Sequence, residues 1–312
     1  MIVTIETRAK SCPGVFKAVD LAEETLRKKG ALISVGQLIH NRREMERLQG
    51  LGLELIENGQ LESYNKNTGE KNAYFLIRAH GEITETIEKA QLAGLEIVNA
   101  TCQIVQHSQK LIEQHIVDGW RIVIVGKKNH AEVLSLISRT RGTGIVISSV
   151  EEISQHDIEE RTLLIAQTTV DPELFAEIRK RLSEKIRELK VVDTTCRFLK
   201  TRQSDIQEFA KTQDVIIVVG GKNSSNLNLL YSISKSVNLR SYFVESPEDV
   251  DLDWFQGAKR VGITGGASTP RWQLEEMKHF LENQNFEENP NGLKNTKGGK
   301  NSWWMWKNHK KK

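Results

Sequence analysis

The sequence predicts an α/β fold made of three similar lobes around a pseudo-threefold axis, each with a parallel sheet covered by helices. Three observations support this prediction. The three cysteines, Cys12, Cys102 and Cys196, lie 90 and 94 residues apart in the 312-residue chain, and such spacing indicates a repeated unit. An amphipathic helical segment and then an apolar strand follow each cysteine. Strands that alternate with helices form parallel sheets with helices on their faces.

The three repeats begin alike. In the first, Val15, Val19, Ala22 and Leu26 mark one apolar face at helical spacing. The matching segments are SCPGVFKAVDLAEETLRKKG with the strand ALISVG, TCQIVQHSQKLIEQHIVDGW with RIVIVG, and TCRFLKTRQSDIQEFAKTQD with VIIVVG. In every copy the strand ends in a glycine 24 residues after the cysteine, at Gly36, Gly126 and Gly220. We expect these glycines to allow a tight turn out of the strand.

Polar side chains recur at two positions that follow strands. Four residues after the glycines stand His40, His130 and Ser224. A second set follows the next apolar strand, where FLIRAHG, LLIAQTT and RVGITGGAS supply His80, Thr168 and Ser268. Ligands of open parallel sheets gather at the carboxyl ends of the strands. The sequence therefore predicts that these side chains and the cysteines share one site.

The strand that leads into each cysteine suggests how the lobes are completed. LEIVNATC and LKVVDTTC lead into the second and third cysteines, whereas the strand before Cys12 is the N-terminal MIVTIET. The third lobe lacks a final strand of its own, so we expect the N-terminal strand to complete it and close the ring. The predicted division is 12–101, 102–195 and 196–282 with strand 1–11, followed by a mobile tail rich in Lys and Trp over 283–312.

Composition excludes several classes of function. The chain is 38% apolar and 27% charged, an ordinary globular composition. Residues 291–312 contain seven Lys and no acidic residue, so residues 1–290 carry 37 basic and 41 acidic side chains, and we expect no nucleic-acid partner. No run approaches eighteen apolar residues and the N-terminus is not a signal sequence, which predicts a cytoplasmic protein without membrane contact. Three cysteines without a C-x-x-C pair suggest neither a disulfide framework nor a zinc knuckle.

The cysteines are candidate ligands of one iron–sulfur cluster. A cysteine at the start of a helix has its thiolate favoured by the helix N-terminus, which lowers the thiol pKa and suits metal ligation. Three such sites around a pseudo-threefold axis would point three sulfurs at one spot. A 4Fe–4S cluster normally takes four thiolates, so three would leave one iron open to substrate. Two alternatives remain, namely inert buried cysteines and a three-cysteine zinc site with bound water.

The recurring polar side chains predict an anion site with one acid beside it. Histidine and hydroxyl donors suit a phosphate-bearing ligand, although such residues also serve as caps and turns. Two residues past the first polar position the repeats diverge to Arg42, Glu132 and Asn226, so a carboxyl occurs in only one copy. Because a carboxyl in a water-poor pocket has a raised pKa, Glu132 is a candidate proton donor; the alternative is a solvated or salt-bridged surface Glu. The candidate anion donors are His40, His80, His130, Ser224, Ser225, Asn226 and Ser268.

Over residues 1–282 the sequence resembles the LytB family of 4-hydroxy-3-methylbut-2-enyl diphosphate reductases. The resemblance lies in the three cysteines and in motifs that follow one another along the chain: H-N, A-H-G, N-A-T-C, G-x-x-x-H-x-E, Q-T-T, K-N-S-S-N and G-A-S. The ordered set is specific although each motif alone is not. The resemblance implies a cloverleaf of three α/β lobes around a 4Fe–4S cluster. It also implies reductive dehydroxylation to isopentenyl and dimethylallyl diphosphates, the last step of the methylerythritol phosphate route.

Carried over to this chain, the resemblance makes Cys12, Cys102 and Cys196 the cluster ligands. Glu132 would supply protons, with Thr168 and His130 near the substrate hydroxyl, and ferredoxin or flavodoxin would supply electrons one at a time. The diphosphate would be held by His40, His80, His130, Ser224, Ser225, Asn226 and Ser268.

This chain also departs from the family pattern. The family has Pro where this chain has Gln103 and Ala131, and Thr where it has Leu199. A divergent cluster-bearing sensor or scaffold without turnover and a zinc hydrolase are the alternative functions.

Overall fold

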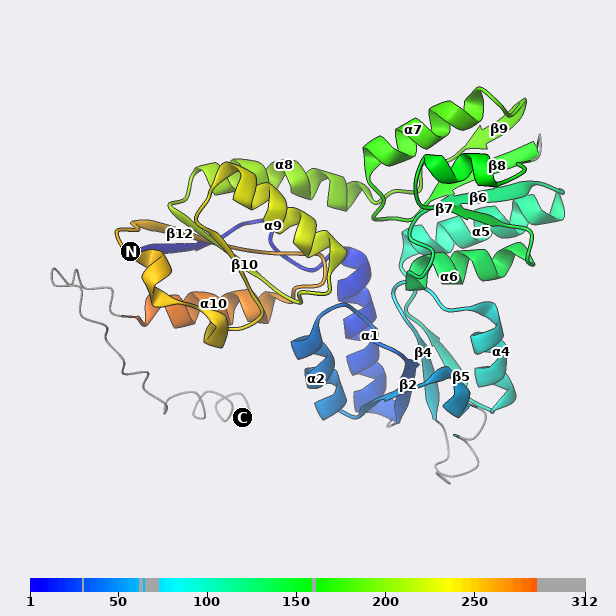
Figure 1. Ribbon diagram of the computed structural model, residues 1–312. Helices are drawn as coiled ribbons and strands as arrows, with labels where there is room; N and C mark the ends of the chain where they lie inside the picture. Colours follow the sequence, from blue (N-terminus) through cyan, green and yellow to red (C-terminus); the bar gives the residue numbers. More distant parts are fainter. Residues whose placement is uncertain (30, 62–63, 65–72, 159–160, 285–312) are drawn as a thin grey trace.

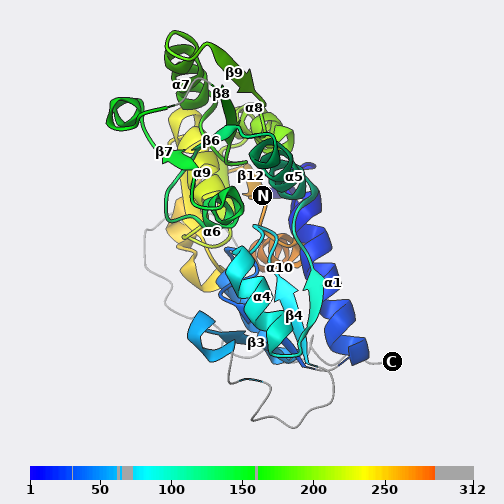
Figure 2. The same ribbon diagram turned by 90° about the vertical axis from the view of Figure 1, so that its right-hand side faces the viewer.

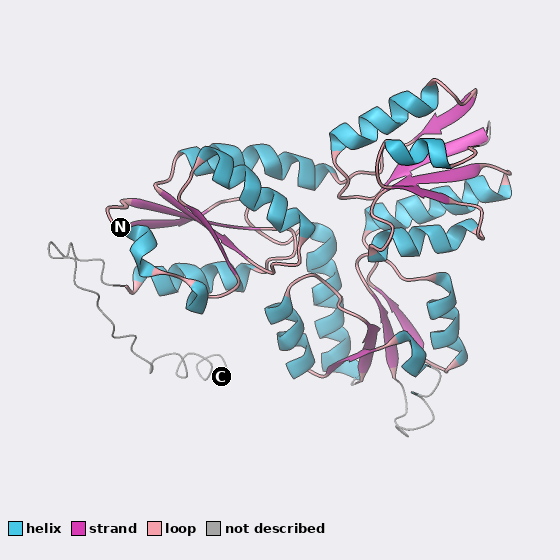
Figure 3. Cartoon of the chain, in the orientation of Figure 1, coloured by secondary structure: helices cyan, strands magenta, loops and turns pink. Residues whose placement is uncertain are grey.

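The computed structural model describes residues 1–312 apart from 30, 62–63, 65–72, 159–160 and 285–312. Three lobes, each a parallel sheet with helices packed on it, make up the described chain (Figures 1 and 3). The predicted Lys- and Trp-rich tail falls almost entirely outside the described residues. Among the described residues, every helix is too short or too polar to cross a membrane.

The first lobe is built on a sheet in the order β3-β2-β4-β5, with all neighbours parallel. Leu32, Leu76 and the apolar face of the first helix form its core. Its strands are β2 (Leu32–Val35), β3 (Leu53–Ile56), β4 (Tyr74–Ile77) and β5 (Glu96–Asn99), and its helices are α1 (Pro13–Lys29), α2 (Arg42–Gly50) and α4 (Thr84–Leu92).

The second lobe repeats this order as β7-β6-β8-β9, again parallel throughout. Val123, Val125 and Leu164 of the central strands have no exposed surface, which explains their continuous apolar runs. Its strands are β6 (Arg121–Val125), β7 (Ile145–Ile147), β8 (Arg161–Ala166) and β9 (Glu188–Val191), and its helices are α5 (Gln103–Val117), α6 (Ala131–Ile137) and α7 (Pro172–Ser183).

The third lobe has the order β11-β10-β12-β1, so the N-terminal strand occupies the edge that β5 and β9 occupy in the other lobes. A buried ion pair fixes it there, because the Arg202 guanidinium donates to the Glu6 carboxylate that directly follows β1. The elements are β1 (Ile2–Ile5), β10 (Val215–Val219), β11 (Ser241–Val244), β12 (Arg260–Gly265), α8 (Arg197–Lys211), α9 (Ser225–Val237) and α10 (Arg271–Glu282).

The helices divide between two sides of the molecule. The cysteine-led helices α1, α5 and α8 lie along one side in Figure 2, and α6 and α9 lie along the other. His130 and Ser224 are the N-caps of α6 and α9. The cysteines and these two polar side chains therefore begin helices on opposite sides of the molecule.

Candidate functional site

The three cysteines occupy equivalent places in the fold. Cys102 and Cys196 are the N-caps of α5 and α8, and Cys12 directly precedes α1. Each cysteine amide donates a 2.9 Å hydrogen bond to a carbonyl in the loop that carries a polar residue of the second set. These bonds join Cys12 to Ala267, Cys102 to Ala79 and Cys196 to Thr168. The repeat thus anchors every cysteine beside Ser268, His80 or Thr168.

The thiols converge on one region. A Cβ on Gly14 would lie 2.7 Å from Cys102 Sγ, so the start of α1 contacts the start of α5. The pKa of Cys12 is raised to about 11, mainly by burial and further by repulsion from the other two thiolates. Burial also raises the pKa of Cys196. The Val15 N–H, 3.4 Å from Cys12 Sγ, lowers the pKa of that thiol, but the effect of burial is larger. The expectation that the helix start lowers the thiol pKa is therefore wrong for Cys12 and Cys196.

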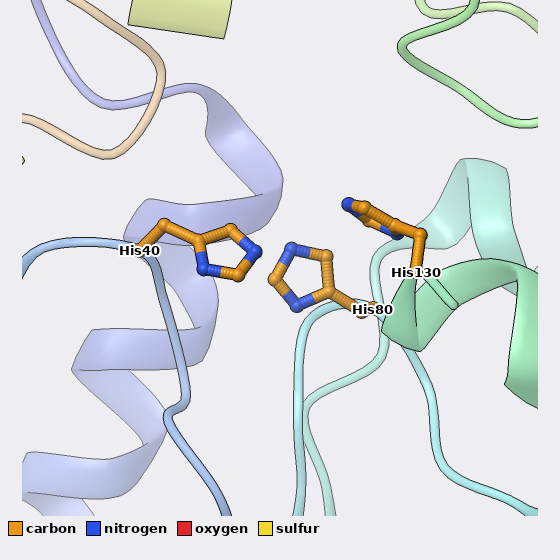
Figure 4. Close-up of side chains that lie close together, drawn as sticks. All are labelled: His40, His80 and His130. Carbon is orange, nitrogen blue, oxygen red and sulfur yellow. The ribbon is translucent and has the colours of Figure 1, made fainter. Parts of the chain in front are cut away.

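Three histidines from two lobes face one another (Figure 4). His40, His80 and His130 follow β2, β4 and β6, and their ring centroids are 5.0, 5.4 and 6.0 Å apart. Burial, followed by mutual repulsion, lowers the pKa of His80 to about 3 and that of His130 to about 4. The pKa of His40 is lowered too, by burial and then by Arg78. All three are therefore neutral near pH 7.

The hydrogen bonding of His130 decides what these rings can bind. One nitrogen from each ring lies within 4.8 Å of the others, a spacing that could hold a metal ion. However, His130 Nδ1 accepts the Glu132 N–H at 3.1 Å while capping α6. The neutral ring must then carry its proton on Nε2, which becomes a donor and has no lone pair for a metal. His80 Nδ1 is also buried without a hydrogen-bond partner. The three rings therefore suit an anion that accepts hydrogen bonds better than a metal ion.

The third lobe brings its own donors to this region. The Ser268 hydroxyl donates to the His40 carbonyl at 3.3 Å, and Lys127 Nζ lies 3.4 Å from Ser225 Oγ. Asn226 Nδ2 is buried without a partner. Ser224 accepts the Leu227 N–H, so part of its bonding capacity caps α9. A pocket of about 280 Å³ opens between lobes one and three, lined by Gln37, His40, Asn41, Arg42, Gly221, Lys222, Asn223 and Glu245.

Glu132 is buried near Cys196, with only 1% of its surface exposed. Its carboxylate accepts the Thr168 N–H at 2.7 Å and the Thr168 hydroxyl at 2.6 Å. Burial raises the pKa of Glu132 to about 7, against the opposing effect of those two bonds. Cys196 lies close enough for its thiolate to be disfavoured by the Glu132 charge. A carboxyl with a pKa near neutral pH therefore lies close to Cys196.

Sequence reasoning missed one charged pair in the site. Arg78 Nε donates at 3.0 Å to Glu82, which is 1% exposed. The Arg78 charge lowers the pKa of each histidine in the trio. The only signal in the sequence was its place two residues before His80. This cation lies within electrostatic range of all three rings and would stabilise a bound anion.

The departures from the family pattern fall at helix starts. Gln103 and Ala131 are the first residues of α5 and α6. Proline is frequent at this position because its φ is already helical and its missing N–H is not needed, so other residues keep the same backbone. Leu199 lies in the first turn of α8, half buried, and its N–H donates to the Cys196 carbonyl at 3.1 Å. The cysteines keep equivalent positions despite these changes.

Comparison with known proteins agrees with the geometry. The chain is 37% identical over 284 residues to the 4-hydroxy-3-methylbut-2-enyl diphosphate reductase of Aquifex aeolicus, covering 90% of this chain and 96% of that protein. The reductase of Bacteroides fragilis is 36% identical over 289 residues, with 90% and 98% covered.

Solved structures extend the likeness to the fold. One of (E)-4-hydroxy-3-methyl-but-2-enyl diphosphate reductase, the terminal enzyme of the non-mevalonate pathway, matches with a TM-score of 0.70 at 35% identity, covering 90% of this chain and 99% of that one. The E-1-hydroxy-2-methyl-but-2-enyl-4-diphosphate reductase of Plasmodium falciparum matches in fold, with a TM-score of 0.77 at 22% identity over 91% and 89%. Because a family model described as LytB protein also matches residues 3–282, the chain belongs to the LytB family.

Proposed function

We propose that this protein is a 4-hydroxy-3-methylbut-2-enyl diphosphate reductase that removes the allylic hydroxyl of its substrate as water. The observation that carries the proposal is that three equivalent cysteines interact with one another, one of them close to the buried, protonatable Glu132, in a chain that also gathers three neutral histidines. The products would be isopentenyl and dimethylallyl diphosphates. Ferredoxin or flavodoxin would be the electron donor.

The cysteines fit a cluster better than a single metal ion. Among the described side chains, the histidine trio is spaced closely enough to hold one metal ion, whereas the three cysteines do not form such a group. Tetrahedral zinc with Zn–S bonds of about 2.3 Å would hold its sulfurs roughly 3.8 Å apart. When bound to Cys12, Cys102 and Cys196, a 4Fe–4S cluster supplies electrons and a Lewis-acidic iron without a protein thiolate.

The polar ring, which we define as His40, His80, His130, Ser224, Ser225, Asn226 and Ser268, would hold the diphosphate. Neutral imidazoles with N–H groups, serine hydroxyls and the Asn226 amide are all donors, so they can bind phosphate oxygens. His80 Nδ1 and Asn226 Nδ2 are buried without partners, and a buried unmade hydrogen bond costs about 1–3 kcal/mol. An anion that accepts from them would remove that cost. The bound charge would also favour protonation of the histidines.

Glu132 would deliver a proton to the leaving hydroxyl. Loss of the hydroxyl as water consumes two electrons and two protons per substrate. A carboxyl with a pKa near 7 is well matched to proton transfer at neutral pH. The Thr168 hydroxyl, 2.6 Å from Glu132 Oε2, can pass the proton on or orient the substrate hydroxyl. Thr168 is itself held by the bond from the Cys196 amide to its carbonyl.

The test is anaerobic purification with iron and sulfide analysis, followed by a turnover assay with 4-hydroxy-3-methylbut-2-enyl diphosphate and reduced viologen. We expect about four irons and four sulfides per chain and both products. A cluster without turnover would instead indicate a sensor or scaffold. Zinc in place of iron would refute the proposed chemistry.

A further inference from the structure

Basic residues are concentrated around the cysteines. The segments 7–17, 97–107 and 191–201 together carry five basic side chains and one acidic, whereas residues 1–290 as a whole carry 37 basic and 41 acidic. A local excess of positive charge on an otherwise acidic body attracts a negatively charged partner. The six charged residues are Arg8, Lys10, Lys17, Asp193, Arg197 and Lys200.

Three of these cations are available to a partner. Arg8 is paired with Asp205 and Lys200 with Asp193. Lys10, Lys17 and Arg197 are exposed, and no ion pair joins them to another of the described residues.

An exposed aromatic residue accompanies them. Phe16 leaves 65% of its surface in solvent and is the one aromatic side chain among the exposed large hydrophobic residues of the described chain. It lies in the first turn of α1, beside Lys17, and its N–H donates to the Cys12 carbonyl at 2.9 Å. An aromatic anchor amid charged residues is typical of a protein-binding surface.

Phe16, Lys17 and Arg197 belong to the cysteine-led helices α1 and α8, which lie on the other side of the molecule from the helices that His130 and Ser224 cap. Figure 2 shows α1, α5 and α8 along one side, with the helices capped by His130 and Ser224 along the other. The starts of α1 and α5 touch where Gly14 meets Cys102, and the Arg8–Asp205 pair links the segment before α1 to α8. A partner on this side could approach the cysteines from the side opposite to the helices that His130 and Ser224 cap.

We propose that Lys10, Phe16, Lys17 and Arg197 form a donor face, the docking surface for a small acidic electron-carrier protein. The inference rests on the proposed function, because a reductase of this kind must receive its electrons from outside. Each docked carrier is oxidised by one electron as the enzyme is reduced by one. Two such transfers and two protons convert one substrate hydroxyl to water. Opposite charges would speed encounter, and Phe16 would anchor the complex.

The test compares two electron donors in the loaded enzyme. The variant Phe16→Ala/Lys17→Glu should lower kcat/KM for a reduced acidic ferredoxin about ten- to a hundredfold, the range over which charge steering changes association rates. Turnover with reduced viologen and the iron content should stay within about twofold of wild type. The control is Lys211→Glu in the last turn of α8, about 22 Å along that helix from its start; this charge reversal should leave both donors unaffected.

A second measurement separates docking from turnover. Stopped-flow absorbance follows reduction of the enzyme by ferredoxin without substrate, and its rate should fall with added salt in wild type and depend less on salt in the variant. Equal ferredoxin rates in variant and wild type would overturn the donor face, as would an equal loss with viologen. Failure of wild type to turn over substrate with viologen would refute the proposed function, while the stopped-flow comparison would still test docking.

Discussion

Replacing Glu132 by Gln should separate proton delivery from binding. The substitution keeps the size of the side chain and an oxygen that can accept the Thr168 N–H, now 2.7 Å from the carboxylate. It cannot release a proton, and general acid catalysis contributes about a hundred- to ten-thousandfold. Turnover should fall by that factor, equivalent to roughly 3–5 kcal/mol in the barrier. Iron content and diphosphate affinity should persist.

The pH dependence sharpens this prediction. Because the pKa of Glu132 is raised to about 7, the protonated fraction, and with it proton-limited turnover, should fall about tenfold per pH unit above that value. The raised pKa also means that the folded metal-free protein binds a proton more tightly than the unfolded chain. Its stability should then drop as pH rises from about 4.5 through 7, by up to about 3 kcal/mol. The Gln variant should lack that drop.

Turnover against pH and urea unfolding at pH 5 and 8 measure these effects. Thr168→Ser, which keeps the hydroxyl beside the carboxyl, is the matched control and should stay within about tenfold of wild type. A Gln variant with wild-type turnover would remove Glu132 from the mechanism. A variant without iron would show that the residue serves the structure instead.

Three further predictions concern the cysteines, the histidines and the closing strand. Cys196→Ser should abolish iron binding and visible absorption along with activity, because each lobe supplies one of three thiolates; an iron-replete, active variant would contradict the ligand set. Inorganic diphosphate should bind with proton uptake, and more tightly as pH falls from 8 to 6, because the anion raises histidine pKa values now held down by burial. Calorimetry in two buffers would measure the proton uptake, and His80→Asn should reduce that uptake. Proton release on binding would refute the site. Arg202→Met should leave the Glu6 carboxylate buried and unpaired, lowering the free energy of unfolding by about 3–5 kcal/mol in urea, whereas an unchanged midpoint would show that the pair does not hold β1.

The repeat explains why so much of the fold could be predicted. Cysteine spacing, helical periodicity and apolar strands are local properties of the chain, and the three sheets have the same strand order, with β1 in the place of β5 and β9. The strand-end rule also placed His40, His80 and His130 together. Such features follow from sequence because a parallel sheet brings the ends of its strands to one edge.

Charge states could not be predicted in the same way. The helix start was expected to lower the cysteine pKa, yet burial raises that of Cys12 to about 11. The raised pKa of Glu132 was predicted in direction, but its bonds to Thr168, 36 residues away, were not. The effect of the Arg78 charge on the histidine pKa values could be recognised only from the position of Arg78 relative to the three rings. Each of these pKa values and contacts depends on groups from segments that are far apart in the sequence.

The sequence by itself determined the threefold α/β design and its closing N-terminal strand. It also determined which side chains stand at the carboxyl ends of the strands, because repeat spacing and periodicity are written along the chain. Only the tertiary structure decided that His130 presents a donor and that Glu132 keeps its proton near pH 7. It also decided that the cysteine-led helices share one side. The reason is physical: proton affinity and exposure depend on the distance to water and to charges from other lobes, and folding alone sets those distances.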